Sequence, residues 1–487
     1  MKKHNLLKVT LLVLFLVVIG TWFLPVTNFS NGSFSTTESI KVGLFHLASY
    51  VGVVLQVFGP IIVYVLSVGG LYGVLYSIPQ YRLLLDKIVD GFKGREWIFM
   101  TTVGVVFAVL SSMAGLSIPL ILLFPFVISI ILLMGYDKIT AAMLVVGSTI
   151  AGLIGSVFSA NDVYGITRLF GSSELEEASN LALNIAKTDV LWKIVLLVVS
   201  LSLVLVNTFL YAKKHKKENV DLEKDLLVPK KVKTSDKRIL PLVIVLDLLL
   251  VVLTLAFISW DLLEVDLFDK LTNGFVSPTG STFVKGLYGG LNTILGLSVN
   301  DNINNVFGHW TIMEAALVVF LASGLIAFLY KGSINKFVSS TEKGIKKALR
   351  PALLVAIAYL ILVVIVTVPF ELTILQHIID VKGRFSLIVM VIIALFYSLL
   401  TVESYYGVIS AASYIGASTV LEGHVGIMAL IWQSMYGLAM LVAPTSILLL
   451  VTLSYLDITY TEWLKAVWKL FLELLVAIFI ILLIFSL

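Results

Sequence analysis

Four acidic residues lie within long apolar stretches of the sequence, namely Asp162, Asp247, Glu314 and Glu403. A carboxylate at the centre of a bilayer costs at least about 2.5 kcal/mol, so each of them needs a partner, water or a proton. Asp162 and Glu403 stand where small and polar residues interrupt the apolar pattern, and we expect them to contact a cationic substrate or a coupling proton. The alternative is a solvated end of a helix or hairpin. Asp247 and Glu314 lie on uninterrupted stretches, which favours hydrogen bonds between helices.

Two of these interruptions occur at matching places in the two halves of the chain. The first is S-V-F-S-A-N-D-V-Y-G at residues 156–165, and the second is A-P-T-S at residues 443–446. Irregular backbone at membrane depth is tolerated only where protein or a water-filled cavity satisfies it, so matched breaks favour a binding site over plain helix kinks. No Lys or Arg lies deep in the surrounding elements. This disfavours a doubly anionic substrate, although helix N-termini and Ser, Thr or Asn donors can bind one carboxylate.

The composition places the chain in a membrane. Of its 487 residues, 59% are hydrophobic and only 13% are charged, which leaves almost no polar surface for a soluble globule. Apolar runs of the roughly 20 residues that a spanning helix needs recur along the whole chain. We therefore expect an all-α polytopic membrane protein. The chain has no cysteine, which excludes disulfides, thiolate metal ligands and a thiol nucleophile.

The distribution of Lys and Arg sets the expected orientation. Lys2, Lys3 and Lys8 precede the first apolar run, at residues 9–24, so the N-terminus is expected in the cytoplasm. That run lacks a clear small-x-small cleavage site, which disfavours a cleaved signal peptide. The Lys and Arg residues clustered between 213 and 238 indicate a cytoplasmic linker rather than a lipid-binding switch. Counting the spans then puts the C-terminus outside the cell membrane. The small net charge of +4 implies no nucleic-acid partner.

Read in this direction, the apolar runs form two inverted-topology repeats, each with a re-entrant helical hairpin and a discontinuous transmembrane helix. The first repeat is predicted over residues 1–212, with its hairpin at about 97–134 and its broken helix at about 139–165. A basic cytoplasmic linker, a linker span and an external loop fill residues 213–308. The second repeat covers residues 309–487, with its hairpin at about 385–420 and its broken helix at about 424–455. Inverted repeats of this kind put a substrate site near the membrane midplane.

Several short phrases, in this order and spacing, carry a family resemblance: G-G-L-Y-G-V-L at 69–75, G-R-E-W at 94–97, S-M-A-G-L-S-I-P at 112–119, G-Y-D at 135–137, S-A-N-D at 159–162 and A-P-T-S at 443–446. With them the chain resembles the YfcC-type carriers, which are relatives of the anaerobic C4-dicarboxylate carriers in the ion-transporter superfamily. The resemblance covers most of the chain. It implies a scaffold that often dimerises and a mobile domain, containing both hairpins, that works by alternating access.

The sequence also departs from the pattern of that family. Gly115 and Leu116 stand where the family has an acidic pair, and Asp162 follows Asn161 where the family has proline. Near the second break, Tyr436 and Met440 replace an aspartate and an asparagine. Glu403 stands where a serine is expected. Because several family ligands are replaced, neither the substrate nor the coupling ion, proton or sodium, transfers from the resemblance.

Enzyme signatures are missing from the chain. It contains no H-E-x-x-H, no Walker loop and no G-x-S-x-G, and its six His residues are dispersed, so we expect no catalytic residue, no bound metal and no cofactor beyond a coupling ion. The absence of an ATP-binding motif favours secondary active transport. A channel, or a membrane-embedded hydrolase using Asp162 or Glu403, is the alternative from another class.

The sequence therefore predicts a secondary active transporter for a small carboxylate-bearing metabolite. The favoured substrate is an amino acid, and a basic amino acid is among the candidates; a C4-dicarboxylate or another organic acid is the alternative. The expected partners are the lipid bilayer and a second copy of the chain. The hairpin tips and the breaks are expected to bind the substrate through Ser112, Met113, Ala114, Gly115, Ser117, Ser159, Asn161, Asp162, Glu403, Ser404, Gly407, Gln433, Pro444, Thr445 and Ser446.

The orientation can be tested by cysteine labelling, since the chain has no native thiol. Cysteines introduced at Lys217 and Lys343 should react with a membrane-impermeant maleimide only from the cytoplasmic side, and one at Asp269 only from outside, because the positive residues are expected inside. Labelling of Lys343→Cys from outside would contradict the inverted repeat.

Overall fold

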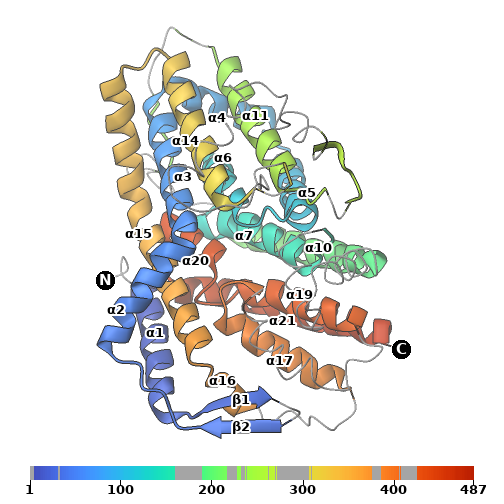
Figure 1. Ribbon diagram of the computed structural model, residues 1–487. Coiled ribbons are helices and arrows are strands. Elements are labelled where there is room, and N and C mark those ends of the chain that lie inside the picture. The colour runs from blue at the N-terminus through green and yellow to red at the C-terminus, as the bar shows by residue number, and fades with distance from the viewer. Residues whose placement is uncertain are drawn as a thin grey trace.

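The computed structural model describes most of the chain, and helices dominate it (Figure 1). The described residues are 5–30, 33–158, 189–215, 227–231, 236, 238–260, 263–268, 270, 307, 308, 310–375, 385–404, 406 and 425–486. The elements of the first half are α1 (Asn5–Phe23), β1 (Val26–Ser30), β2 (Ser33–Thr37), α2 (Leu44–Val53), η2 (Val54–Phe58), α3 (Gly59–Ser77), α4 (Pro79–Gly91), α5 (Glu96–Ala114), η3 (Pro119–Leu123), α6 (Phe124–Leu133), α7 (Lys138–Ile154) and α10 (Val190–Lys214). Those of the second half are α11 (Leu240–Phe257), α14 (Ile312–Leu329), α15 (Ile334–Thr367), α16 (Glu371–Leu375), α17 (Leu387–Leu400), α19 (Val425–Met440), α20 (Ile447–Leu456) and α21 (Tyr460–Ser486).

Eight helices among the described residues are long and apolar enough to cross a membrane. They are α1, the continuous α2–η2–α3 helix, α5, α10, α11, α14, α15 and α21. This confirms the prediction of a helical, polytopic membrane protein. The short antiparallel hairpin of β1 and β2, in which Val26 pairs with Thr37, was not expected in an all-α chain.

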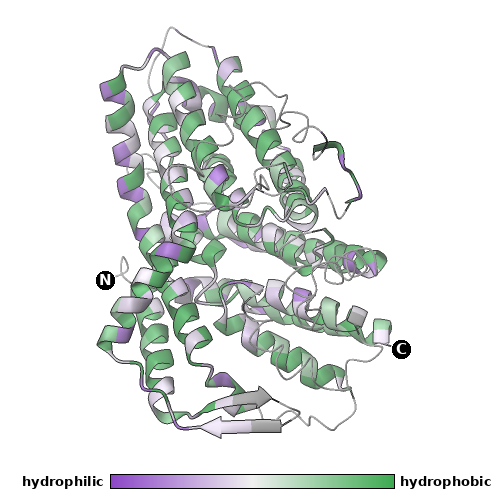
Figure 2. Cartoon of the chain, viewed as in Figure 1, coloured by the Kyte–Doolittle hydropathy of each residue, from purple (hydrophilic) through white to green (hydrophobic). Residues whose placement is uncertain are grey.

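Helix α11 illustrates why these helices belong in lipid. Leu242, Leu249 and Leu253 are buried against the rest of the protein, whereas Ile244 and Leu248 are about half exposed. Both faces are therefore apolar, which is the pattern of a helix with protein on one side and hydrocarbon on the other. Figure 2 shows the same hydrophobic colouring around most of the outer helices.

The two longest helices, α2–η2–α3 and α15, pack closely along their length. A Cβ on Gly344 of α15 would lie 2.0 Å from the carbonyl oxygen of Gly69, and one on Gly73 would lie 2.1 Å from that of Ser340. Small residues four apart let the backbones of membrane helices approach in this way. This contact explains the glycines of the G-G-L-Y-G-V-L phrase.

Helix α15 includes a stretch that charge alone would assign to a loop. The Lys and Arg residues between 331 and 350 suggest a cytoplasmic loop before an apolar span, but α15 runs through 34 residues with Pro351 inside it. Its basic first half and its apolar second half thus form one continuous rod. The second half is almost wholly buried among other helices.

Helices α7 and α19 lie at the centre of the molecule and run across the direction of α3 and α14 (Figure 1). Every residue of α7 from Thr140 to Ile154 is buried, and α19 contacts it directly. In the same view α10 lies beside α7, and α21 lies beside α19. With 17 and 16 residues, α7 and α19 are both shorter than the roughly 20 residues of a full span.

Candidate functional site

The end of α5 is hydrogen-bonded to the end of α7, where that helix stops at Gly155. The hydroxyl of Ser111 donates to the carbonyl of Thr149 (2.9 Å), and the hydroxyl of Ser112 donates to that of Gly155 (2.6 Å). The carbonyl of Ser112 in turn accepts from the backbone N–H of Val157 (3.0 Å). The last carbonyls of a helix have no partner within it, so the Ser112 hydroxyl satisfies a backbone group that the end of α7 leaves open.

The same end of α7 is contacted from the other side by α19. The side-chain amide of Gln433, only 4% exposed, donates to the carbonyl of Ile154 (3.1 Å). One turn further on, a Cβ on Gly437 would lie 2.6 Å from the backbone nitrogen of Ile154. Glycine is therefore required there, and the two helices meet backbone against backbone at the point where α7 is interrupted.

A second interruption separates α19 from α20, at residues 441–446. Side chains of α21 satisfy its backbone: the indole of Trp463 donates to the carbonyl of Leu441 (2.9 Å), and the hydroxyl of Tyr460 donates to that of Val442. The hydroxyl of Ser446 caps α20 by accepting from the N–H of Leu449 (3.4 Å). The break is thus a built feature with assigned partners rather than a frayed helix end.

The end of α17 reaches this second interruption as the end of α5 reaches the first. The hydroxyl of Tyr436, on α19, donates to the carbonyl of Val402 (3.2 Å), and that of Thr445 lies 3.5 Å from the carbonyl oxygen of Leu399. Gln433 and Tyr436 are three residues apart and share one face of α19. Hydrogen bonds therefore join the end of α5 to α7, α7 to α19, and α19 to the end of α17; we call this set of contacts the polar crossing.

Glu403 lies immediately beyond the polar crossing. Its carboxylate accepts a hydrogen bond of 2.5 Å from the hydroxyl of Tyr359, a fully buried residue of α15. The Tyr359 ring stacks on Phe58, with ring centroids 4.0 Å apart. A carboxylate with a hydroxyl donor on one side is suited to hold a proton or a cationic group on the other.

The structure brings several of the predicted site residues into this region. Ser112, Ala114 and Gly115 form the end of α5, Ser117 is half-buried in the following turn, and Gln433, Pro444, Thr445 and Ser446 belong to α19 and the second interruption. Glu403 and Ser404 follow α17. The side chain of Met113 is 43% exposed and lies on the outer face of α5. Ser159, Asn161, Asp162 and Gly407 fall outside the described residues.

Sequence reasoning missed two contributors, Tyr359 and Tyr436. Tyr436 was noted only as a departure from the family pattern, although its spacing from Gln433 would have placed both on one face of a helix. Tyr359 is 44 residues from Glu403, and no local pattern pairs them. The hydroxyls of Tyr359 and Tyr436 donate to the Glu403 carboxylate and to the carbonyl of Val402.

The side chains around the polar crossing are suited to bind a solute rather than to catalyse a reaction. Its donors are mostly neutral hydroxyls and an amide, and the only charged side chain named in it is the Glu403 carboxylate. In the part of the chain that the structure describes, no group of three His, Asp or Glu side chains could hold a metal ion. The end of α7 and the break between α19 and α20, each supported by neighbouring helices in a multi-pass membrane protein, are features that membrane carriers use to bind their substrates.

Comparison with known proteins identifies the family. The sequence model of the C4-dicarboxylate anaerobic carriers matches residues 4–486, so the chain belongs to the C4-dicarboxylate anaerobic carrier family. Among solved structures it is similar to the Alcanivorax borkumensis YdaH transporter, described as having an unusual topology, with 13% identity, a TM-score of 0.43 and coverage of 98% of this chain and 97% of that chain. The comparison with curated proteins gave no match.

The polar crossing can be tested through Gln433. The change Gln433→Met keeps the volume but leaves the buried carbonyl of Ile154 without its donor, which should lower the free energy of unfolding by about 1–3 kcal/mol. Thermal unfolding in detergent measures the loss. Gln56→Met, at an exposed position of η2, is the matched control and should leave the melting temperature unchanged. Equal melting temperatures for the two variants would show that the hydrogen bond of Gln433 to Ile154 does not stabilise the protein.

Proposed function

We propose that this protein is a secondary active transporter that moves a small carboxylate-bearing metabolite by alternating access. The polar crossing carries the proposal. It joins two interrupted helices that occupy matching places in the two halves of the chain, and each is met by the end of a neighbouring apolar helix, α5 or α17. In membrane carriers, discontinuous helices of this kind form the substrate site near the bilayer midplane.

The finer architecture belongs to the same proposal. The first repeat would contain α1, α3, a re-entrant hairpin of α5 and α6, the broken α7 and α10; the second would contain α14, α15, a hairpin beginning with α17, the broken α19–α20 and α21. The short second arm of the first hairpin, 15 residues from Pro119 to Leu133, supports re-entry, since it is too short to span. The cytoplasmic N-terminus, the external C-terminus, the homodimer and the cell membrane stay predictions from the sequence.

For the substrate we favour an amino acid. The described residues of the turns, 111–118, 154–158, 399–404 and 440–447, include no Lys or Arg, and their one charged side chain is Glu403. A carboxylate can be held there by hydroxyls and backbone N–H groups, whereas an ammonium group would pair with Glu403. A basic amino acid would gain a second favourable contact at Asp162. Glu403 and Asp162 are also the candidate sites for a coupling proton; sodium is the other candidate ion.

A C4-dicarboxylate is the second candidate, because the chain belongs to a family named for that substrate. It would need neutral donors for both carboxylates, one set at each interruption. A channel or a membrane-embedded hydrolase is the remaining alternative, and the carrier family disfavours both.

Counterflow in proteoliposomes separates these candidates. Vesicles loaded with unlabelled lysine, serine, succinate or fumarate are diluted into traces of the labelled compound, and a carrier gives transient accumulation that saturates with concentration. We expect counterflow with an amino acid. Accumulation with the C4-dicarboxylates alone would support the second candidate, conductance without saturation would indicate a channel, and a chemically altered product would indicate an enzyme.

The change Glu403→Gln should separate substrate binding from charge recognition. Because it deletes one charge and little volume, we expect transport to persist with a flatter pH profile and with at least about tenfold weaker discrimination of cationic over neutral substrates. Tyr359→Phe, which removes the hydroxyl donor to that carboxylate, should shift the same pH profile.

Glu342→Gln is the matched control, because Glu342 is exposed on α15 and pairs only with Lys346 among the contacts described. It should behave as the parent protein. If Glu403→Gln keeps both the pH profile of the parent protein and its discrimination of cationic over neutral substrates, Glu403 is a structural residue. No acidic side chain among the described residues would then support the amino-acid proposal.

A further inference from the structure

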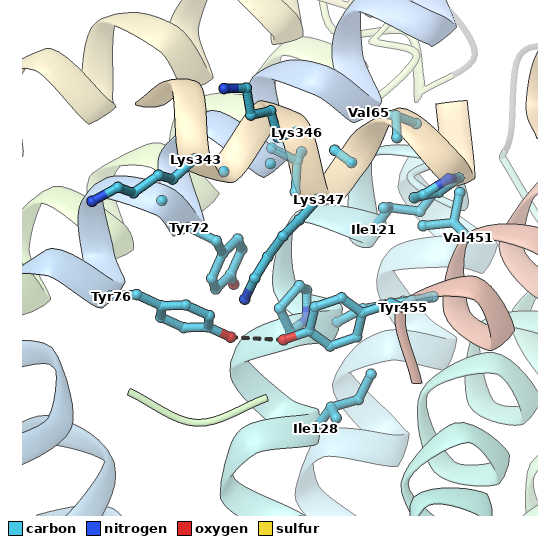
Figure 3. Close-up of a pocket in the computed structure, with 18 of the residues that line it drawn as sticks. Val65, Tyr72, Tyr76, Ile121, Ile128, Lys343, Lys346, Lys347, Val451 and Tyr455 are labelled. Carbon is cyan, nitrogen blue, oxygen red and sulfur yellow. Dashed lines mark hydrogen bonds between the residues drawn. The ribbon is translucent and has the colours of Figure 1, made fainter. Parts of the chain in front are cut away.

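A cavity of about 480 Å³ lies away from the polar crossing, between the α3–α15 pair on one side and η3, α6 and α20 on the other (Figure 3). Val65, Ile121, Phe124, Ile128 and Val451 contribute apolar walls. The first half of α15 forms its rim, where Lys343, Lys346 and Lys347 are exposed. The cavity thus runs from a basic surface into an apolar interior.

The tyrosine hydroxyls that line the cavity have hydrogen-bond partners within the protein. The hydroxyl of Tyr72 donates to the carbonyl of Leu122 (2.7 Å). Those of Tyr76 and Tyr455 are hydrogen-bonded to each other (2.6 Å), and Tyr76 also donates to the carbonyl of Leu227 (3.3 Å). Since these hydroxyls already have protein partners, the interior suits a hydrocarbon better than a hydrated solute with several polar groups.

One lysine differs from its neighbours. Figure 3 shows the side chain of Lys347 pointing into the cavity, with its ammonium nitrogen 5.1 Å from the centroid of the Tyr76 ring. Lys346 points away from the cavity in the same view and pairs with Glu342 (2.5 Å). Lys343 extends along the rim. The cavity therefore has a positive group at its mouth and apolar space behind it.

We propose that this cavity binds an anionic phospholipid, with an acyl chain against the apolar walls and the phosphate at Lys347 and Lys343. Charge complementarity supports this occupant, because basic pockets between membrane helices bind anionic headgroups and the rest of the lining offers a chain only apolar contact. A soluble dicarboxylate fits less well, since its second carboxylate would face the hydrophobic interior without a donor.

The position of the cavity gives the lipid a structural consequence. The α3–α15 pair is joined to α20 and the turn after it by the Tyr76–Tyr455 hydrogen bond and by the ion pair of Arg350 with Asp457 (3.0 Å). A chain in the cavity contacts helices on both sides of this joint. Anionic lipid should therefore hold the two sides together and raise the melting temperature.

Lipid binding to the purified, detergent-solubilised protein tests the proposal. Dioleoyl phosphatidylglycerol and dioleoyl phosphatidylcholine are titrated in turn, with retained lipid measured by native mass spectrometry and stability by thermal unfolding. We expect phosphatidylglycerol to be retained and to raise the melting temperature more than phosphatidylcholine does. Lys347→Gln should weaken its retention about fivefold, whereas Lys346→Gln should leave retention as in the parent.

A second variant addresses the apolar part. Val451→Phe places a larger side chain in the cavity and should reduce retention of phosphatidylglycerol without changing any charge. Equal loss in Lys346→Gln and Lys347→Gln would overturn the proposal in favour of general surface attraction. Equal stabilisation by glycerol phosphate would indicate a free phosphate site, and displacement of the lipid by succinate would assign the cavity to a soluble anion; either result also overturns it. None of these readouts depends on transport, so they stand apart from the proposed function.

Discussion

Backbone polar groups in an apolar interior must find hydrogen-bond partners, and that constraint organises the centre of this protein. Where α7 and α19 are interrupted, carbonyl oxygens leave the helical pattern, and side chains from other helices donate to them: Ser112 from α5, Gln433 from α19 and Trp463 from α21. An unpaired group at this depth would cost several kcal/mol in lipid. The interruptions can persist only because neighbouring helices are held in place around them.

This arrangement connects fold to transport. A helix that continued through the membrane would have every N–H and C=O engaged, with nothing to offer a substrate. An interrupted helix has such groups outside the helical pattern, and the side chains that pair with them here limit where the helix can move. The chain places two interruptions side by side, so any displacement of α7 relative to α19 must break contacts at Ile154. Motion between access states is therefore expected to carry these helices together.

The sequence predicted the membrane class, most spans and the break at A-P-T-S, because hydropathy and small polar residues are local signals. It did not predict that residues 331–350 continue as a helix into the following span, since basic residues resemble a loop when read only by charge. Nor could it pair Tyr359 with Glu403 or Gln433 with Ile154, because those contacts depend on how distant helices cross. The family match covers residues 4–486, nearly the whole chain.

The central claim is that both halves of the chain contribute to one substrate site. Substrate protection of introduced cysteines tests it directly, using Ser117→Cys beside α5 and Ser404→Cys beside α17, both half-buried, with Lys336→Cys on the basic first half of α15 as the exposed control. The account predicts that a compound active in counterflow slows alkylation at both site positions, over the same concentration range, and leaves the control unchanged. Protection at one position only, or at neither, would contradict a site shared by the two halves.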